Sequence, residues 1–148
     1  MHVADITKRP AATISASDSI AEAAAKMRDL DVGILSVLEN DKLVGVITDR
    51  DIVVRFLASG LSDKHVRVGD VMSTQVLMCF ENQTIADAAA TMGDYQIRRL
   101  PVCDRAERVI GMLCLDKIAE DYSEHLAGET LGEIVETRNL PNWADWRR

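Results

Sequence analysis

The sequence predicts an α/β (α+β) fold built from two tandem βαββα repeats. Three observations predict it: the chain matches itself at a fixed offset, each copy begins a helix with a capping signature, and each copy then carries two short apolar segments around a turn. The chain has 148 residues, of which 47% are hydrophobic and only 4% aromatic. That composition suits an aliphatic core, in one domain or in two half-size units.

The internal repeat is the clearest signal in the sequence. A shift of 65 positions lays Ile20–Met27 on Ile85–Met92. One inserted residue then moves the offset to 66, where Gly45 falls on Gly111. Chance matching could explain the run of alanines, but not a register that is held over most of each copy. We therefore infer a duplication, with pseudo-twofold symmetry between the copies.

Each copy is expected to begin with a short strand followed by a helix. The strands are predicted at residues 12–15 and 76–80. Each helix then begins at a capping-box pattern, in which a hydroxyl side chain precedes an acidic residue by three positions. The capping residues are Ser19 and Glu22 in the first copy, and Thr84 and Asp87 in the second.

A hairpin and a second helix complete each copy. Strands are predicted at residues 34–38 and 43–47 around the turn Asn40-Asp41, and a helix from about 49 to 58. The second copy repeats the pattern at residues 100–103, 109–114 and 116–124.

The chain beyond the repeats forms a tail. We divide the sequence into repeat 1 at residues 1–62, repeat 2 at 63–126 and a C-terminal helical tail at 127–148. Apolar spacing predicts a helix over residues 129–137, and Pro141 should end regular structure. Trp143 and Trp146 are the two tryptophans of the protein. We expect them to pack on their own chain or a dimer mate, with contact to a partner protein as the alternative.

Charge and hydropathy exclude several classes of partner. The net charge of −7 argues against nucleic acid, which is bound through a cationic face. The sequence contains no apolar run near the ~20 residues that span a bilayer, so no membrane segment is predicted. The first residues do not resemble a signal peptide, and the expected location is cytoplasmic.

Motifs for catalysis or metal binding are missing. The three cysteines, Cys79, Cys103 and Cys114, form no C-x-x-C pair, which favours buried thiols in a reducing compartment, with a zinc site or a catalytic thiol as the alternative. The sequence has no phosphate loop, no zinc-protease motif and no nucleophile elbow. We therefore predict a protein that is not an enzyme, has no catalytic or metal-binding residue and requires no cofactor.

The strongest local motif runs from Gly45 to Ile52. Thr48 ends a predicted strand, and Asp51 lies in the first turn of the next helix. A carboxylate can accept two hydroxyl hydrogen bonds, which suits the 2′ and 3′ hydroxyls of ribose. The N–H groups at the start of a helix favour a nearby anion. The alternative is that Thr48 and Asp51 only cap the helix.

The repeat and two short motifs together resemble a known family. The motifs are Gly-x-x-Thr-x-x-Asp from Gly45 to Asp51, and Ile-Arg-Arg-Leu-Pro-Val from Ile97 to Val102. Over residues 3–124 the chain is similar to a cystathionine-β-synthase (CBS) domain pair, also called a Bateman module. Such modules bind AMP, ADP, ATP, S-adenosylmethionine or related adenosyl ligands, often regulate another protein, and often form dimers.

The resemblance implies a role for each matching residue. Thr48 and Asp51 match the ribose-binding pair, and Arg98 and Arg99 match positions that face the ribose and phosphates of the same ligand from the other copy. Three aliphatic residues match the adenine pocket, and one further arginine is a second candidate for phosphate. The implied ligand-binding residues are Thr48, Asp51, Arg98, Arg99, Val46, Leu77, Ile97 and Arg50. The alternatives are that Arg98 and Arg99 pair with surface carboxylates, and that Arg50 is solvated or ion-paired.

The two copies differ at these positions. Cys114 stands opposite Thr48, and Lys117 stands opposite Asp51. Gly33 and Ile34 stand opposite the two arginines. Both losses affect the same cleft between the copies, so we expect one competent nucleotide site per chain.

The sequence thus predicts a stand-alone regulatory module. It would bind an adenine nucleotide (AMP, ADP, ATP or a related adenosyl ligand), form a homodimer and modulate a target protein that the sequence does not identify. One alternative is a structural or protein-binding homodimer with a vestigial cleft, in which the tail is the working surface. Another is an unrecognised enzyme that acts on a nucleotide.

Overall fold

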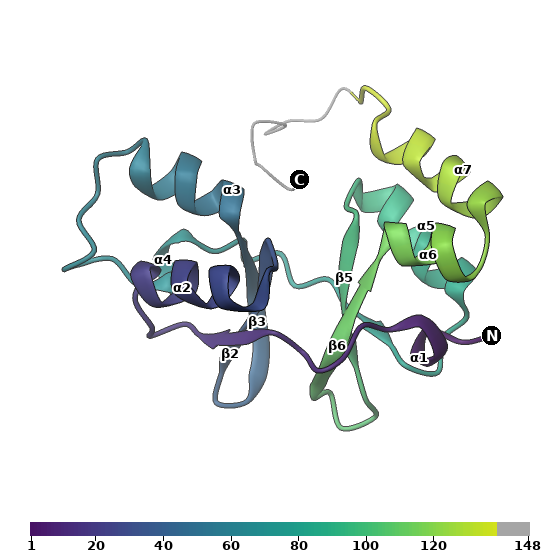
Figure 1. Ribbon diagram of the computed structural model, residues 1–148, viewed down its shortest axis with the longest axis horizontal. Helices are drawn as coiled ribbons and strands as arrows, with labels where there is room; N and C mark the ends of the chain where they lie inside the picture. The colour runs from purple at the N-terminus through teal and green to yellow at the C-terminus, as the bar shows by residue number, and fades with distance from the viewer. Residues whose placement is uncertain (139–148) are drawn as a thin grey trace. The chain divides into compact units, whose positions relative to one another are not determined.

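The computed structural model describes residues 1–138, which form two compact units (Figure 1). The first-repeat unit is Ala12–Val76. The second-repeat unit combines Met1–Ala11 with the described chain from Leu77 to Arg138. The bounds of these units differ from the bounds of the repeats, which the sequence places at residues 62 and 126. The division into repeats stays a prediction. Pro141, Trp143 and Trp146 lie outside the described residues.

The first-repeat unit contains a three-stranded sheet in the order β1-β2-β3. Strand β1 (Thr13–Ser15) pairs in parallel with β2 (Ile34–Glu39), and β2 pairs antiparallel with β3 (Lys42–Thr48). Helix α2 (Ile20–Leu30) makes the crossover between the parallel strands. This is the predicted β-α-β-β order, and the structure confirms the mixed α/β class.

Helix α2 begins where its capping signature predicted. The Ser19 hydroxyl accepts a hydrogen bond from the Glu22 amide at 3.1 Å, which satisfies an amide that has no partner inside the helix. One face of the helix is buried against the sheet. The buried aliphatic residues from the two elements include Ile20, Ala23, Met27, Leu35, Val37 and Ile47. Each large side chain buried in this way contributes about 1.5–3 kcal/mol.

The second helix of this unit departs from the prediction. We expected one helix from about residue 49 to 58. The structure has a single α-turn, α3 (Asp49–Asp51), followed by the π-helix η1 (Ile52–Leu57), in which the Ala58 amide donates to the Val53 carbonyl at 3.0 Å. Ile52, Val53 and Val54 are β-branched and disfavour the regular α-helix.

The second-repeat unit repeats the same topology in the order β4-β5-β6. Its elements are β4 (Cys79–Phe80), α5 (Ile85–Tyr95), β5 (Arg99–Cys103), β6 (Val109–Cys114) and α6 (Leu115–Asp121). The cap of α5 is confirmed, because the Asp87 amide donates to the Thr84 hydroxyl at 3.1 Å. Strand β4 is shorter than the predicted 76–80, and α6 ends before residue 124, where a further helix begins.

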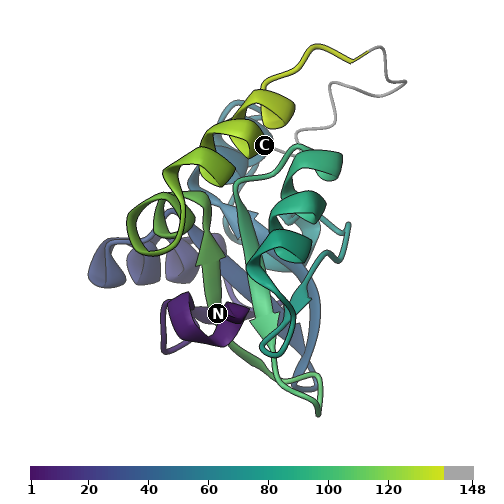
Figure 2. The ribbon, with the colours of Figure 1, turned by 90° about the vertical axis from the view of Figure 1, so that its right-hand side faces the viewer.

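That further helix is α7 (Glu124–Ile134), so the tail helix begins and ends earlier than the predicted 129–137. It packs against both α5 and α6 (Figure 2). The Gln96 side chain donates to the Glu133 and Glu136 carbonyls at 3.2 and 2.6 Å, and the Arg138 guanidinium donates to the Gly93 and Asp94 carbonyls at 3.1 and 2.8 Å. Each helix end thus receives donors from the other segment, which satisfies carbonyls that have no partner inside the helix.

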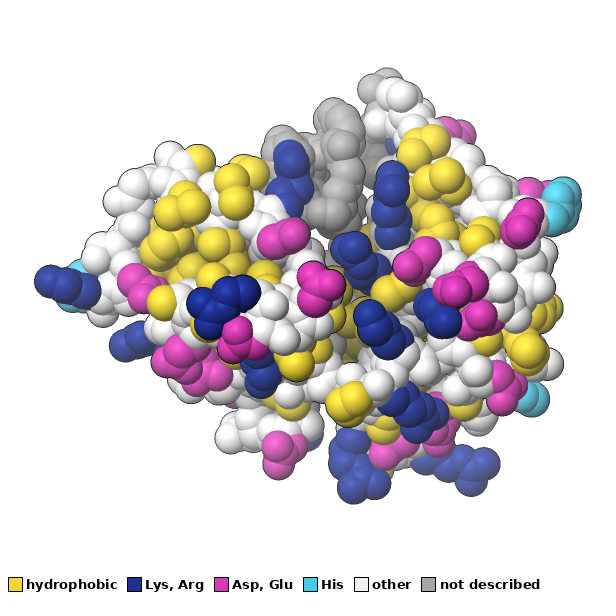
Figure 3. Space-filling view, viewed as in Figure 1, with side chains coloured by type: hydrophobic (Ala, Val, Ile, Leu, Met, Phe, Trp, Pro, Cys, Tyr) yellow, Lys and Arg dark blue, Asp and Glu magenta, His cyan; other side chains and the backbone are white. Residues whose placement is uncertain are grey.

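The helices of the first-repeat unit have no such cover among residues 1–138. Ala89 of α5 is 2% exposed beneath α7, whereas Ala24, its counterpart in α2, is exposed. Val53 and Leu57 of η1 are 55% and 62% exposed. Hydrophobic side chains gather over this part of the unit in Figure 3.

Short segments that precede each repeat complete the units. Helix α1 (Val3–Ile6) buries Val3 and Ile6 in the core of the second-repeat unit, and Lys8 then forms an antiparallel bridge with Met112 of β6, with both N···O distances at 3.0 Å. Helix α4 (Val68–Val71) does the same in the first-repeat unit. Each repeat is thus completed by the leading segment of the other.

A glycine makes each of these bridges possible. A Cβ atom at Gly111 would collide with the Lys8 carbonyl and the Thr7 side chain, and one at Gly45 would collide with the Ser73 carbonyl. Gly45 and Gly111 are the repeat-related pair found in the sequence, so their shared role is close approach of a backbone segment. In the described residues, no helix is long and apolar enough to cross a membrane.

We predict that Gly111→Ala destabilises the protein by about 1–3 kcal/mol, because the leading segment must move away from β6. Gly128→Ala is the matched control, since a Cβ atom there meets nothing within 4 Å and the residue lies in α7. This control should leave stability unchanged or raise it by up to about 1 kcal/mol. Chemical denaturation measures both, and equal midpoints for Gly111→Ala and wild type would contradict the assigned role.

Candidate functional site

Thr48 and Asp51 form a reciprocal capping box at the end of β3. The Asp51 amide donates to the Thr48 hydroxyl at 3.0 Å, and the Thr48 amide donates to Asp51 Oδ2 at 2.9 Å. The capping alternative raised by the sequence is therefore realised. It leaves the second oxygen of Asp51 available for other interactions.

That second oxygen lies beside a guanidinium group. Asp51 Oδ1 is 3.6 Å from Arg55 Nε, while Arg55 Nη1 donates to the Val71 and Met72 carbonyls at 3.4 Å. Asp51 is only 3% exposed. Burial raises the pKa of its carboxyl group above the usual value, although the hydrogen bonds with Thr48 and the charge of Arg55 act in the opposite direction. The fold thus keeps a carboxylate where burial disfavours its charged form.

Val46 and Thr48 share one face of the sheet. They alternate along β3 with Ile47, which is buried in the core, and both are half-buried. Thr48 pairs with Ile34 and Val46 pairs with Ser36 across β2. Arg50 is exposed in the turn that follows, and its amide donates to Asp49 Oδ1 at 2.8 Å.

Sequence reasoning missed Ser36. Its hydroxyl group is buried on this face, 1% exposed for the residue, and has no hydrogen-bond partner within residues 1–138. A buried hydroxyl of this kind normally has a partner. A lone serine inside an apolar strand gives no signal in a sequence.

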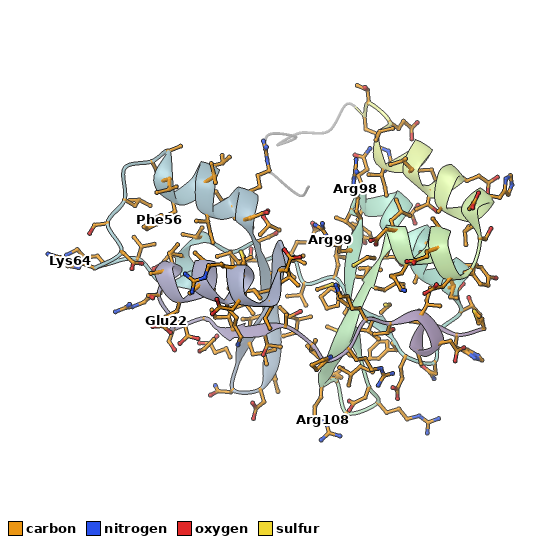
Figure 4. All side chains as sticks on the ribbon, viewed as in Figure 1. Glu22, Phe56, Lys64, Arg98, Arg99 and Arg108 are labelled. Carbon is orange, nitrogen blue, oxygen red and sulfur yellow. The ribbon has the colours of Figure 1, made fainter. Side chains whose placement is uncertain are left out.

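Arg98 and Arg99 belong to the second-repeat unit, where β5 begins (Figure 4). Both are exposed, and neither forms an ion pair with a carboxylate of the described chain, so the surface-pairing alternative is not realised there. Leu77 and Ile97 are partly buried and pack against the core of the same unit.

The second repeat carries different chemistry at the positions of Thr48 and Asp51. Cys114 precedes α6, and within residues 1–138 its thiol makes no capping hydrogen bond. Lys117 Nζ lies 2.6 Å from Asp121 Oδ2 and 3.5 Å from Glu120 Oε2. Here a thiol and an ion-paired ammonium group replace the hydroxyl and the carboxylate.

The cysteines are free and do not favour the thiolate form. Burial raises the pKa of Cys79 to about 12 and that of Cys103 to about 11. Burial also raises the pKa of Cys114. Residues 1–138 contain no group of three or more His, Cys, Asp or Glu side chains arranged to hold a metal ion.

The eight candidate residues are therefore divided between the two units. The first-repeat unit holds Val46, Thr48, Arg50 and Asp51, and the second-repeat unit holds Leu77, Ile97, Arg98 and Arg99. Within the first group all four residues lie between Val46 and Asp51, and within the second Ile97, Arg98 and Arg99 are consecutive while Leu77 packs against the same core as Ile97. That all eight contact one ligand stays a prediction.

Two copies of one α/β repeat, each with its own three-stranded sheet, define a tandem-repeat module. The chain belongs to the CBS domain family, because the model of that domain matches residues 3–58 and again residues 68–124. The sequence-based assignment to CBS domain pairs is thus confirmed.

Two similar proteins are matched over most of their own length. The CBS domain-containing protein YhcV of Bacillus subtilis is 37% identical over 133 residues, which cover 89% of this chain and 94% of YhcV. Hypoxic response protein 1 of Mycobacterium tuberculosis is 30% identical over 122 residues, which cover 82% of this chain and 85% of that protein.

Solved structures show the same fold. The structure of Hypoxic Response Protein I with two coordinated zinc ions has a TM-score of 0.74 at 29% identity. The match covers 82% of this chain and 98% of that protein's chain. The CBS domain pair of protein MJ0100 was solved in complex with 5′-methylthioadenosine and S-adenosyl-L-methionine. It has a TM-score of 0.71 at 29% identity, and the match covers 81% of this chain and 98% of the MJ0100 chain. MJ0100 shows that a CBS pair similar to this one binds adenosyl compounds.

We predict that Asp51→Asn keeps the fold, with stability within about 1 kcal/mol of wild type at neutral pH, because Thr48 remains the N-cap and the side-chain oxygen of an asparagine can still accept from the Thr48 amide. The raised pKa means that Asp51 favours the folded state at low pH, where it is protonated, and that this contribution is lost as pH rises through the folded-state pKa. The stability of Asp51→Asn relative to wild type should therefore increase with pH. Urea titrations across the acidic range measure this, and the opposite slope would contradict the assigned burial effect.

Proposed function

We propose that this protein is a regulatory module that binds an adenine nucleotide and acts on a partner protein. The observation that carries the proposal is Asp51, a carboxylate that is 3% exposed and whose pKa burial raises, at the end of the Gly-x-x-Thr-x-x-Asp motif. A buried carboxylate that burial penalises is a candidate functional group. The adenosyl ligands of MJ0100 support the same class of ligand.

The proposed contacts follow the chemistry of the side chains. Asp51 and Thr48 would bind the ribose hydroxyls, since the carboxylate keeps one oxygen outside the capping box. Arg98 and Arg99 would bind the phosphates through their planar donor groups, with Arg50 as a further phosphate contact. The adenine ring would contact aliphatic side chains, namely Val46, Leu77 and Ile97.

We further propose that the protein acts by binding alone, needs no cofactor and works in the cytoplasm. The proposed contacts are a ribose-binding carboxylate, phosphate-binding cations and an aliphatic adenine pocket, which are the parts of a binding site. The three free thiols fit a reducing compartment. The target protein would sense whether the nucleotide is bound, because a ligand shifts a conformation only by preferring one state.

AMP or ATP should raise the melting temperature, with about 2.7 kcal/mol of stabilisation at a ligand concentration of 100 times Kd. Asp51→Ala should abolish the gain, and Asp51→Asn, which keeps the cap, should reduce it. Lys117→Ala changes the equivalent position of the second repeat and is the matched control, so it should leave the gain intact. Scanning calorimetry and titration calorimetry measure these effects, with one nucleotide bound per chain.

Two results would contradict these proposals separately. Absence of any adenosyl ligand binding at millimolar concentration would exclude the sensor and favour the structural homodimer. Two equivalent sites per chain would overturn the expected difference between the repeats. A double-mutant cycle of Asp51→Ala and Arg98→Ala tests whether both residues contact one ligand, since effects on independent ligands add.

We also propose that the protein forms a homodimer through the uncovered helical face of the first-repeat unit. This apolar stripe consists of Val53 and Leu57 of η1 and of Leu61, which follows the turn after η1; they are 55%, 62% and 46% exposed. In the second-repeat unit, α7 covers the matching helix α6. A twofold axis would place the stripe against its own copy, and its three apolar side chains avoid like-charge repulsion across that axis. A second copy is therefore the proposed occupant.

Leu57→Glu should convert the dimer to a monomer, because it places two like charges at the centre of a twofold interface. Leu131→Glu is the matched control, since Leu131 is 39% exposed on α7 of the other unit. Light scattering coupled to size-exclusion chromatography measures both masses. A dimer that survives Leu57→Glu but not Leu131→Glu would place the interface on α7 instead.

A further inference from the structure

The segment that precedes the first repeat adds a cation to the second-repeat unit. Lys8 pairs with Met112 of β6 through two backbone hydrogen bonds of 3.0 Å. Cys114 lies two residues further along β6, and Arg99 is its partner across β5. Paired residues share a sheet face, and so do residues two apart on a strand.

Lys8, Arg99 and Cys114 therefore lie on one face of this sheet. The other face carries Leu100, Val102 and Leu113, which are buried in the unit's core. The electrostatics agree with this placement. Burial and the charge of Asp116 raise the pKa of the Cys114 thiol, while the charges of Arg99 and Lys8 and a hydrogen bond with Arg99 lower it.

Lys8 and Arg99 on this face, and Arg98 next to Arg99 in the chain, lack carboxylate partners in the described chain. We call these three residues the cationic group. None of the three forms an ion pair with a carboxylate among residues 1–138. The chain has 24 acidic residues and a net charge of −7, so acidic side chains are abundant. Lys8 and Arg99 both act on the Cys114 thiol, and cations without carboxylate partners in an acidic protein indicate a place for an external anion.

The first repeat provides an internal comparison. Ser73 occupies the position of Lys8 and pairs with Val46 in the same way, at 2.8 and 3.2 Å. Ile34 occupies the position of Arg99 and pairs with Thr48. The same backbone geometry thus carries uncharged side chains in one unit and cations in the other. The fold does not require the charges.

We propose that Lys8 is a phosphate-binding residue and that the cationic group selects adenosyl ligands with a negatively charged 5′ substituent. This proposal rests on the proposed function. The preferred ligands of the site would be nucleoside phosphates rather than 5′-thioether or 5′-sulfonium compounds. A phosphate carries up to two negative charges and accepts charge-assisted hydrogen bonds from lysine and arginine. A sulfonium group beside three unpaired cations is repelled. This chain would thus differ in ligand class from MJ0100, whose structure contains 5′-methylthioadenosine and S-adenosyl-L-methionine.

The test compares three ligands that share adenosine and differ at the 5′ position. They are AMP, which is anionic there, 5′-methylthioadenosine, which is neutral, and S-adenosyl-L-methionine, which carries a sulfonium. Titration calorimetry should show AMP binding at least tenfold more tightly than either of the others, as expected for hydrogen bonds to charged groups. The advantage of AMP should shrink as salt concentration rises.

Lys8→Gln should weaken AMP about tenfold and leave 5′-methylthioadenosine within twofold of wild type. Lys8→Arg should keep the preference for AMP. Arg105→Gln is the matched charge control, because Arg105 lies in the turn between β5 and β6, at the other end of these strands from Arg99. The variants should fold, since the backbone of Lys8 makes the bridge to Met112.

The outcomes separate this inference from the function it rests on. If none of the three ligands binds, the proposed function fails. If 5′-methylthioadenosine or S-adenosyl-L-methionine binds as tightly as AMP, the function stands and the selection by charge is wrong. If Lys8→Gln weakens AMP and 5′-methylthioadenosine equally, or leaves AMP unchanged, the role of Lys8 is overturned.

Discussion

The antiparallel bridge between a leading segment and the last strand of the other repeat is the constraint on which the structure depends. It needs two glycines, Gly45 and Gly111, because any side chain there would meet backbone carbonyl or side-chain atoms of the arriving segment. It also joins Val3 and Ile6 to one core and Val68 and Val71 to the other. Neither repeat is a closed folding unit by itself, which agrees with the small surface that a half-size unit can bury alone.

Local signals predicted most of the elements. The caps at Ser19 and Thr84 and the two hairpins were predicted because capping and turn chemistry act within a few residues. The departures depend on contacts or crowding that short motifs do not encode. The π-helix contains a β-branched run, and α7, which begins at Glu124 after the Ser123 cap, packs on α5 and α6. Alternating patterns also overestimated β4, which has only two paired residues.

The candidate site likewise has a part set by local sequence and a part set by distant contacts. Thr48 and Asp51 lie three residues apart, so their joint geometry follows from one turn of chain and could be predicted, although capping and binding gave the same pattern. In the structure each residue uses one oxygen in the cap, and the second oxygen of Asp51, which lies 3.6 Å from Arg55 Nε, is the atom proposed to bind ribose. Lys8 could not be predicted, because its place beside Cys114 arises from pairing with a strand about a hundred residues away, and its repeat partner is an uncharged serine.

The two repeats share one fold but carry different side chains at equivalent positions. Both units keep the same backbone bridge, yet the first carries the hydroxyl and the carboxylate while the second carries Lys8 and Arg99 on the equivalent sheet face. Lys117, where a second carboxylate would stand, is paired with Asp121 and Glu120 and so contributes no free cation. The groups proposed to bind ribose and those proposed to bind phosphate thus belong to different units. The proposed ligand class requires both kinds of group, because a nucleotide carries hydroxyl groups on its ribose and negative charge on its phosphates.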